Sequence, residues 1–434
     1  MKIISQTDKD FDQIIESTLK KRCGEIDNKV EGAVRKIILA VKQKGDLALF
    51  EFTNKFDRIN LNSANIQISA KEIQSAYTKV PKKNINALKR AASRIKNFHR
   101  LQKEKSWKFK EATGTVLGQI IKPICAVGLY APGGKAAYPS SVLMNAIPAK
   151  TAGVKKLILC TPTPRGAINP YVLIAADIAG VDEIYRIGGA QAVAAMAYGT
   201  KSIPRVDKIV GPGNIYVATA KKLVFGTVGI DMIAGPSEIF IIADGSGNPE
   251  FIAADMLSQA EHDEQAIPVL TTTSRQLANK VISELKSQTK RSARSQIIKN
   301  SLKKNCKIFL VKNLKDAALI SNSFAPEHLE LAVKNPYRLL KLIDAAGAVF
   351  LGHFTPEAIG DYAAGPNHVL PTGGTARFFS PLGVYDFYKR TSLISCNKAG
   401  LKNLAEPVIN IAEIEGFHAH AEAVRVRVQG IKKF

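Results

Sequence analysis

Residues 126–162 read AVGLYAPGGKAAYPSSVLMNAIPAKTAGVKKLILCTP. A short apolar run ends in a Pro-Gly-Gly loop, a helical stretch follows, and a second apolar run closes the segment. Parallel strands need a long crossover, usually a helix, and buried parallel strands are written as continuous apolar runs. The segment therefore predicts a strand–helix–strand unit on a parallel sheet.

The same alternation continues to about residue 380. It runs through EIYRI and DKIVGPG, and then through SEIFIIAD, AIPVLTTT and KIFLV, with helical segments between them. Residues 1–110 have a mostly helical pattern, and residues 107–134 look like two strands. The chain from about Pro381 ends in a helical stretch interrupted at Gly416. These patterns predict an α/β fold of two Rossmann-like units with incomplete parallel sheets and with helical N-terminal and C-terminal extensions.

Composition excludes several classes of protein. The chain has 434 residues, 46% of them hydrophobic, which is ample for a sizeable core. Its five cysteines are scattered without a CxxC pair, which argues against a thiolate zinc site or a disulfide framework and fits a reducing compartment. The first residues are too charged for a secretory signal, and no run of about 18 apolar residues occurs. We expect a cytoplasmic protein without a membrane span.

The net charge of +24 is the least ordinary feature of the composition. Residues 79–110 carry twelve Lys and Arg against one acid, and residues 286–307 carry eight and no acid. A nucleic-acid-binding protein is one interpretation. Solvated helix faces are the interpretation that we favour, because no recognition motif accompanies the charge. Aromatic side chains are not interleaved with the basic runs, as a base-stacking surface would require.

Six of the seven histidines follow residue 260, and most have acidic or amide neighbours. Gln259 and His262 are three residues apart, so a helix places both on one face. Glu327 and His328 follow Pro326, which predicts that they lie in the first turn of a helix, where the dipole favours ionised Glu and neutral His. These are the forms that a general base needs, so the pair could be catalytic. The alternative is that Glu327 only stabilises a helix start and that His328 is a surface histidine.

Two further segments combine histidine with carboxylates. Asp361 and His368 bracket the Gly/Pro-rich stretch GDYAAGPNHVLPTGG, and long loops in compact domains tend to be functional. Glu415, His418 and His420 stand in EIEGFHAH. The two imidazoles of an HxH pair face one way on a strand but not on a helix.

Three strand–glycine–helix junctions occur in GLYAPGGK, RIGGAQAV and VGPGNIYVA. Backbone N–H groups at such junctions can bind phosphate, so three of them in one unit favour a nucleotide crevice. The first junction is not a Walker A motif, because Leu129 and Ala136 stand where glycine and Ser/Thr would be needed.

Together these blocks carry a family resemblance over nearly the whole chain. The segments are GLYAPGGKAAYPSSVLMNAIPAKTAGV, RIGGAQAVAAMAYGT, KIVGPGN, IDMIAGPSE, DMLSQAEHD, APEHLEL, GDYAAGPNHVLPTGGTARF and EGFHAH. In this order they resemble the histidinol dehydrogenases. The resemblance implies a zinc-dependent homodimeric oxidoreductase that oxidises L-histidinol to L-histidine through L-histidinal, the last two steps of histidine biosynthesis. NAD would accept the hydrides.

The resemblance also implies a role for individual residues. Glu327 and His328 would be the catalytic acid–base pair. One zinc per subunit would be held by Gln259, His262, Asp361 and His420. The substrate would contact Ser237, Gln259, His262, His328, Asp361, His368, Glu415 and His420. NAD would contact Tyr130, Gln191 and Asn214. His418, two residues before His420, leaves the fourth zinc ligand open.

The expected domains follow from this assignment. Residues 1–25 would be an N-terminal helical extension, and residues 26–128 with 237–380 would form the unit that carries zinc and the catalytic residues. Residues 129–236 would carry the NAD contacts, and residues 381–434 would form a helical tail contributing to the partner subunit's site. Two alternatives stay open: a related zinc- and NAD-dependent dehydrogenase acting on another polar alcohol, and the basic nucleic-acid-binding protein.

Overall fold

The computed structural model describes residues 1–22, 28–133, 138–233 and 235–431. The Gly134–Lys135 part of the first glycine junction lies outside them. The chain divides into two compact units. Unit 1 comprises Met1–Gln102 and Cys125–Asp386, and unit 2 comprises Lys103–Ile124 and Phe387–Phe434.

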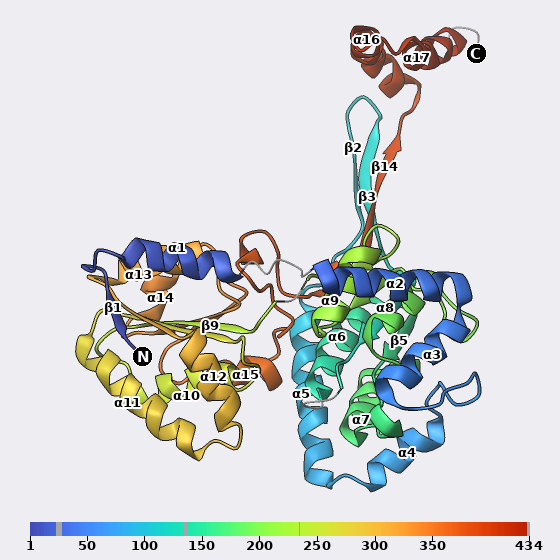
Figure 1. The fold of residues 1–434 in the computed structure, drawn as a ribbon. Coiled ribbons are helices and arrows are strands. Elements are labelled where there is room, and N and C mark those ends of the chain that lie inside the picture. The colour runs from blue at the N-terminus through green and yellow to red at the C-terminus, as the bar shows by residue number, and fades with distance from the viewer. Residues whose placement is uncertain (23–27, 134–137, 234, 432–434) are drawn as a thin grey trace. The chain divides into compact units, whose positions relative to one another are not determined.

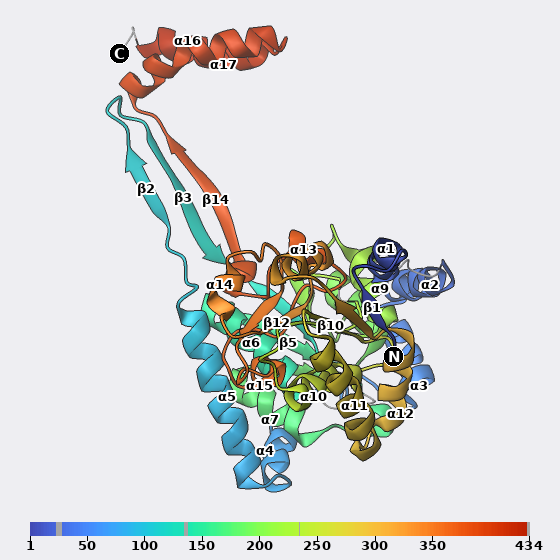
Figure 2. The ribbon, with the colours of Figure 1, turned by 90° about the vertical axis from the view of Figure 1, so that its left-hand side faces the viewer.

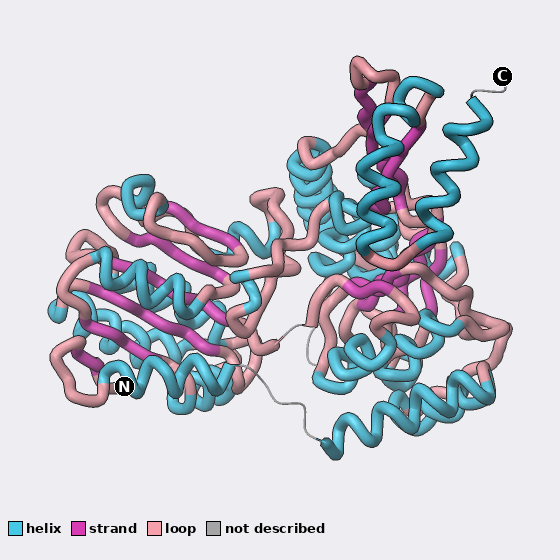
Figure 3. The backbone as a smooth tube through the Cα atoms, turned by 90° about the horizontal axis from the view of Figure 1, so that it is seen from above, coloured by secondary structure: helices cyan, strands magenta, loops and turns pink. Residues whose placement is uncertain are grey.

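Unit 1 contains two parallel sheets, the larger with six strands (Figures 1 and 3). Its strands, in spatial order, are β1 (Ile3–Ser5), β11 (Lys307–Leu310), β10 (Ile267–Thr272), β9 (Glu238–Ala243), β12 (His328–Ala332) and β13 (Ala348–Leu351). From β9 the chain proceeds outward through β10 and β11, and it then returns to add β12 and β13 on the other side. Apart from the edge strand β1, these five strands follow the order of a Rossmann fold that lacks its sixth strand.

Helices cover both faces of the six-stranded sheet (Figure 1). One face carries α10 (Pro249–Ala260), α11 (Arg275–Arg291) and α12 (Ser295–Lys304), and the other carries α1 (Phe11–Arg22), α13 (Leu314–Phe324) and α14 (Pro336–Leu340). Along β9, Ile239 and Ile241 face the first group, whereas Phe240 and Ile242 face the second. The strand is therefore apolar without alternation, because both of its faces are buried.

The second sheet of unit 1 has five parallel strands. In spatial order they are β6 (Glu183–Tyr185), β5 (Lys156–Cys160), β4 (Ala126–Tyr130), β7 (Lys208–Val210) and β8 (Gly229–Ile230). The direction of strand addition reverses between β4 and β7, as it does between β9 and β12 in the larger sheet. The predicted fold class, with two incomplete Rossmann-like units, is confirmed.

The N-terminal helices pack on this five-stranded layer. Its own crossover helices are α6 (Pro139–Ala152), α7 (Pro170–Ala179), α8 (Gly189–Tyr198) and α9 (Ile215–Val224). The added helices are α2 (Asn28–Lys44), α3 (Asp46–Asp57), α4 (Ala70–Thr78) and α5 (Lys82–Arg100). Helices α2 and α3 contact α8, and α2 also contacts α9. Helix α4 contacts α7, and α5 contacts both α6 and α7.

This packing differs from the predicted grouping of residues 26–128 with 237–380. The apolar faces of α2 and α3 are buried with β5 and β7 in one core, and β4 itself belongs to the five-stranded sheet. Residues 1–25 also differ from a purely helical extension, because β1 pairs with β11. The helical periodicity correctly predicts that these segments are helices, but it does not say which sheet a helix will cover.

Unit 2 is an antiparallel sheet followed by a helical hairpin (Figure 2). Its strands are β2 (Trp107–Lys110), β3 (Val116–Pro123) and β14 (Tyr388–Ser395), and its helices are α16 (Lys398–Ile414) and α17 (His418–Ile431). Residues 107–130 thus form three strands where two were predicted, the third being β4. The two helices break at Gly416 (φ 77°), where the sequence predicts an interruption, but the predicted helical tail of residues 381–434 also contains the strand β14.

The remaining elements are short. They are α15 (Glu357–Tyr362) and the 3₁₀ turns η1 (Pro164–Gly166), η2 (Thr375–Arg377) and η3 (Val384–Phe387). No helix within the described ranges has the length and apolar character needed to cross a bilayer.

Gly211 follows β7 with φ of 116°, and a Cβ there would overlap the backbone carbonyl oxygen of Tyr130. We expect Gly211→Ala to lower the free energy of unfolding by several kcal/mol, because backbone strain and a backbone clash add together. Gly226 is the matched control, since its φ is 95° but nothing lies within 4 Å of the position that a Cβ would take. Gly226→Ala should cost about 1 kcal/mol. Equal losses of stability in urea unfolding would contradict the clash.

Candidate active site

The candidate active site lies at the amino ends of β9 and β12. The two strands pair in parallel with His328 opposite Ile239, so Glu327, the residue before β12, lies beside Glu238, the first residue of β9. The backbone N–H of Glu238 donates to Glu327 Oε2 at 2.8 Å. The backbone carbonyl of Glu238 lies 3.0 Å from His328 Nδ1. One residue of β9 therefore holds both members of the Glu327–His328 pair.

This contact fixes which nitrogen of His328 carries hydrogen. A carbonyl oxygen can only accept, so Nδ1 must be the donor. Nε2 then faces two carboxylates, at 3.6 Å from Glu357 Oε1 and 3.7 Å from Asp361 Oδ1. Among the described residues, neither Nε2 nor Glu357 Oε1 has a hydrogen-bond partner, although both are buried. Nε2 is therefore the atom available to exchange a proton with a bound molecule.

The buried ionisable groups of the cluster shift one another's pKa. Burial lowers the pKa of His328, but the carboxylate of Glu327, together with Asp361 and Glu357, outweighs burial and raises that pKa to about 10. Burial raises the pKa of Glu327 to about 8. Burial and the charge of Asp361 raise the pKa of Glu357 to about 7. Burial by itself would raise the pKa of Asp361 as well. The interaction of the Asp361 carboxylate with His328 outweighs burial and holds the pKa of Asp361 well below its usual range. Shifted acid and base groups of this kind are typical of active sites.

Three more predicted residues gather around this cluster. His368 lies with Nδ1 2.8 Å from the Asp361 backbone carbonyl and with Nε2 3.4 Å from Ser141 Oγ. His262 Nδ1 lies 3.4 Å from Ser237 Oγ. Burial lowers the pKa of both histidines, and the charge of Asp361 partly opposes this. Both imidazoles are therefore close enough to Asp361 to sense its charge.

Gln259 is fully buried on α10, yet neither its amide oxygen nor its amide nitrogen has a hydrogen-bond partner among the described residues. An unsatisfied buried amide costs about 1–3 kcal/mol, so it points to a missing partner. Separately, ligand atoms of His328, Glu357 and Asp361 lie within 4.8 Å of one another, as a metal-binding group requires.

The predicted helix start at Glu327 and His328 is wrong. Helix α13 ends at Phe324, Ala325 adopts a left-handed conformation that closes it, and His328 opens strand β12. The strand inserts between β9 and β13, where all five of its residues are buried. Neighbouring strands, which are invisible in the local sequence, decide this conformation. Backbone groups of β9 therefore replace the helix dipole as the environment of the pair.

Glu357 is the main residue that the sequence analysis missed. It lies four residues before Asp361 on α15, and that spacing places both carboxylates on one helix face. Behind it, Glu330 and Asp255 are also buried, and burial raises the pKa of each. Glu330 follows His328 by two residues in β12, so the strand period places both on the same face of the sheet.

The three predicted NAD contacts lie on the five-stranded sheet, at carboxyl ends of its strands. Tyr130 ends β4, and its hydroxyl accepts from the N–H of Gly189 at 3.0 Å. Gln191 lies in the first turn of α8, with its buried Oε1 unpaired among the described residues. Asn214 caps α9 through hydrogen bonds from the N–H groups of Tyr216 and Val217. Tyr130 and Asn214 flank the switch point between β4 and β7, where such sheets bind ligands.

Glu415 and His420 belong to unit 2. Glu415 caps the end of α16, and His420 lies in the first turns of α17, where its ring packs against Phe417 at 5.3 Å between centroids. Because His418 and His420 stand on a helix, their side chains point to different sides.

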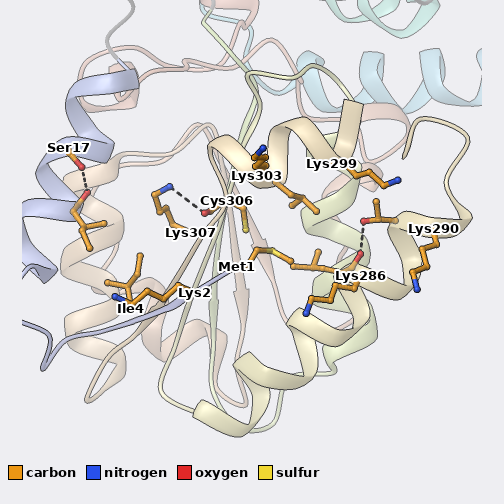
Figure 4. Close-up of a pocket in the computed structure, with 14 residues that line it drawn as sticks. Met1, Lys2, Ile4, Ser17, Lys286, Lys290, Lys299, Lys303, Cys306 and Lys307 are labelled. Carbon is orange, nitrogen blue, oxygen red and sulfur yellow. Dashed lines mark hydrogen bonds between the residues drawn. The ribbon is translucent and has the colours of Figure 1, made fainter. Parts of the chain in front are cut away.

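A separate cavity of about 870 Å³ lies on unit 1 between the N-terminus, α11 and α12 (Figure 4). Its basic side chains are Lys2, Lys286, Lys290, Lys299, Lys303 and Lys307. All except Lys307 are exposed, which is typical of solvated helix faces with apolar stems beneath charged tips. None of the residues of the Glu327–His328 cluster lines it. The cluster has the shifted acids and bases, so we assign the functional site there.

The chain is similar to known proteins over almost its whole length. The family model described as histidinol dehydrogenase matches residues 20–428. A histidinol dehydrogenase of Syntrophotalea carbinolica is 52% identical over 430 residues, with 99% of each chain covered. One of Geobacter sulfurreducens is 52% identical over 430 residues, covering 99% of this chain and all of the relative. The crystal structure of histidinol dehydrogenase from Elizabethkingia anophelis superposes with a TM-score of 0.94 at 37% identity, covering 100% and 99% of the two chains. The chain therefore belongs to the histidinol dehydrogenase family.

Proposed function

We propose that this chain oxidises L-histidinol to L-histidine through L-histidinal, using NAD and one zinc ion per subunit. The observation that carries the proposal is the buried Glu327–His328 pair. Nε2 of His328 faces Asp361 and Glu357 and has no hydrogen-bond partner among the residues that the structure describes. Relatives that carry the histidinol dehydrogenase name match over almost the whole chain, which supports the same reaction here.

The residues present fit a zinc ion. Gln259 offers a buried amide without a partner among the described residues, and His262 and Asp361 supply the imidazole and the carboxylate that zinc accepts. We propose that these three hold zinc together with His420. When bound, zinc would orient the substrate by interacting with the amine and imidazole nitrogens of L-histidinol.

The five-stranded sheet supports an NAD site at its carboxyl edge. We propose that Tyr130, Gln191 and Asn214 contact the dinucleotide, because two of them flank the switch point and one has a buried amide oxygen that is unpaired among the described residues. NAD would supply the hydride acceptor for both oxidations.

The two members of the acid–base pair would have different tasks. In its neutral form, His328 would take the alcohol proton at Nε2, since Nδ1 is occupied by the Glu238 carbonyl. Glu327 would remove a proton from the water that attacks the histidinal carbonyl. Its Oε2 is held by the Glu238 N–H, which leaves Oε1 for the water. His328 would act again as base in the second oxidation. Retaining the aldehyde between the steps protects a reactive intermediate.

We further propose that the active enzyme is a homodimer in which Glu415 and His420 enter the partner subunit's site. Unit 2 leaves large apolar side chains uncovered in the single chain, including Ile414 (85% exposed), Ile394 (71%) and Phe417 (54%). Its helical hairpin buries only small residues, such as Ala405, Ala412 and Ala421. An exposed apolar surface of this kind is typical of subunit interfaces.

The decisive experiment is NADH formation with L-histidinol on protein as purified, after chelation, and after zinc is restored. Alcohol to carboxylate is a four-electron oxidation, so two NADH should form per histidinol, and the activity should vanish and return with the metal. A zinc-loaded, folded protein that forms NADH only with a different polar alcohol would favour the related-dehydrogenase alternative.

Glu327→Gln should separate the two half-reactions. The amide keeps an acceptor for the Glu238 N–H but cannot take a proton from water, so turnover of L-histidinal should fall by about 10²–10⁴-fold while single-turnover oxidation of L-histidinol is largely kept. His328→Asn is the comparison, because it should impair both. Equal loss of both half-reactions in Glu327→Gln would refute the division of roles.

Gln259→Met should stabilise the metal-free protein by about 1–3 kcal/mol, because it removes a buried unsatisfied amide. The same variant should lose the rise in Tm that zinc produces by binding the folded state. Thr271→Val is the matched control. Thr271 is also buried, and its hydroxyl has no partner in the described ranges, but it lies on β10 and not among the proposed ligands. A metal-free Gln259→Met less stable than the parent, with its zinc response intact, would sink the ligand assignment.

A further inference from the structure

Glu238 holds the catalytic pair with its backbone, so whatever fixes Glu238 also fixes the pair. Its carboxylate is fully buried at the start of β9 and receives two hydrogen bonds from Arg22, at 2.7 Å from Nε and 2.5 Å from Nη2. The N–H of Gly373 donates to the same carboxylate at 3.2 Å. Arg22 is the last residue of α1 and is only 4% exposed.

Arg22 also reaches the segment that leads into β12. Its Nη1 donates to the backbone carbonyl of Phe324, and its guanidinium carbon lies 3.4 Å from the centroid of the Phe324 ring. Phe324 ends α13, three residues before Glu327. One guanidinium therefore connects the start of β9 with the approach to the catalytic pair. The planar fork of arginine fits this double task, whereas the ammonium of lysine cannot make all three contacts at once.

Anchoring α1 does not require this ion pair. Phe11 already packs edge-to-face on Phe309 at 5.8 Å between centroids, and Ile14, Ile15 and Leu19 join the same core. Removing two charges from water opposes folding, and well-packed apolar replacements of buried ion pairs are often as stable or more so. The pair thus contributes a defined geometry more than it contributes stability.

We propose that Arg22 is a positioning residue for the Glu327–His328 pair and acts through Glu238. Loss of the fork would let the backbone of residue 238 shift. The N–H that holds Glu327 and the carbonyl that holds His328 Nδ1 would then move together. The inference rests on the roles proposed above for Glu327 and His328.

The test compares three variants of the zinc-loaded full-length enzyme, each assayed well below its own Tm. Arg22→Lys keeps the charge without the fork. The double variant Arg22→Met with Glu238→Gln removes both charges, so no lone buried charge opposes folding. Phe11→Leu is the control, because it loosens the same helix on the same sheet without touching Glu238. The readouts are kcat for L-histidinol and for L-histidinal, KM for NAD, bound zinc, and the pH profile of kcat.

The inference predicts that Arg22→Lys and the double variant lose roughly 10- to 100-fold in kcat for both substrates, as small misplacements of catalytic groups do. The pH profile should shift, because His328 loses its fixed Nδ1 partner. Bound zinc and the KM for NAD should stay unchanged. Phe11→Leu should lower Tm and leave kcat and the pH profile as they are.

Wild-type kcat and pH profile in Arg22→Lys and the double variant would overturn the inference, and so would an equal loss of kcat in Phe11→Leu. Glu327→Gln in the same assays separates this failure from that of the proposed function. If Glu327→Gln behaves as expected while the Arg22 variants do not, only the positioning role of Arg22 is refuted. If Glu327→Gln leaves both half-reactions intact, the assigned role of Glu327 falls first.

Discussion

The parallel register between β9 and β12 is the constraint on which the site depends. Because His328 pairs with Ile239, the amino ends of both strands coincide, and the backbone N–H and carbonyl of Glu238 reach the side chains of Glu327 and His328. A shift of the register by one residue would turn His328 to the opposite face of the sheet. Apolar side chains pack on both faces of β9 and bury the strand completely, and this packing holds the register.

The cluster at this edge opposes folding and is maintained by its surroundings. Glu327, His328 and Glu357 are buried, and Asp361 is nearly so. Burying ionisable groups is unfavourable, and the pKa values of these groups move accordingly. Within the described part of the chain, Gln259, His328 and Glu357 keep side-chain atoms without a hydrogen-bond partner. Such departures from good packing concentrate at functional sites, where geometry is selected at the expense of stability.

The two sheets of unit 1 share a strand order, but the proposed NAD contacts and the Glu327–His328 pair lie at opposite ends of their strands. In the five-stranded sheet, Tyr130 and Asn214 lie at carboxyl ends beside the switch point, which is the usual ligand edge of an open parallel sheet. In the six-stranded sheet, Glu327 and His328 lie at the amino end of β12. Strand order by itself therefore does not locate the chemistry, and the positions of individual side chains must be known.

The sequence by itself determined the layers and the candidate residues. Continuous apolar runs separated by helical segments required parallel sheets covered by helices, and the blocks around Gln259, Glu327 and Asp361 carried the family resemblance. Only the tertiary structure decided that Glu327 and His328 open a strand, that α2–α5 cover the five-stranded sheet, and that Arg22, Glu238 and Glu357 belong to the site. The physical reason is that sequence periodicity is local information: it shows which face of a single helix or strand is apolar. Contacts such as that of Arg22 with Glu238, 216 residues apart, exist only once the strands have paired.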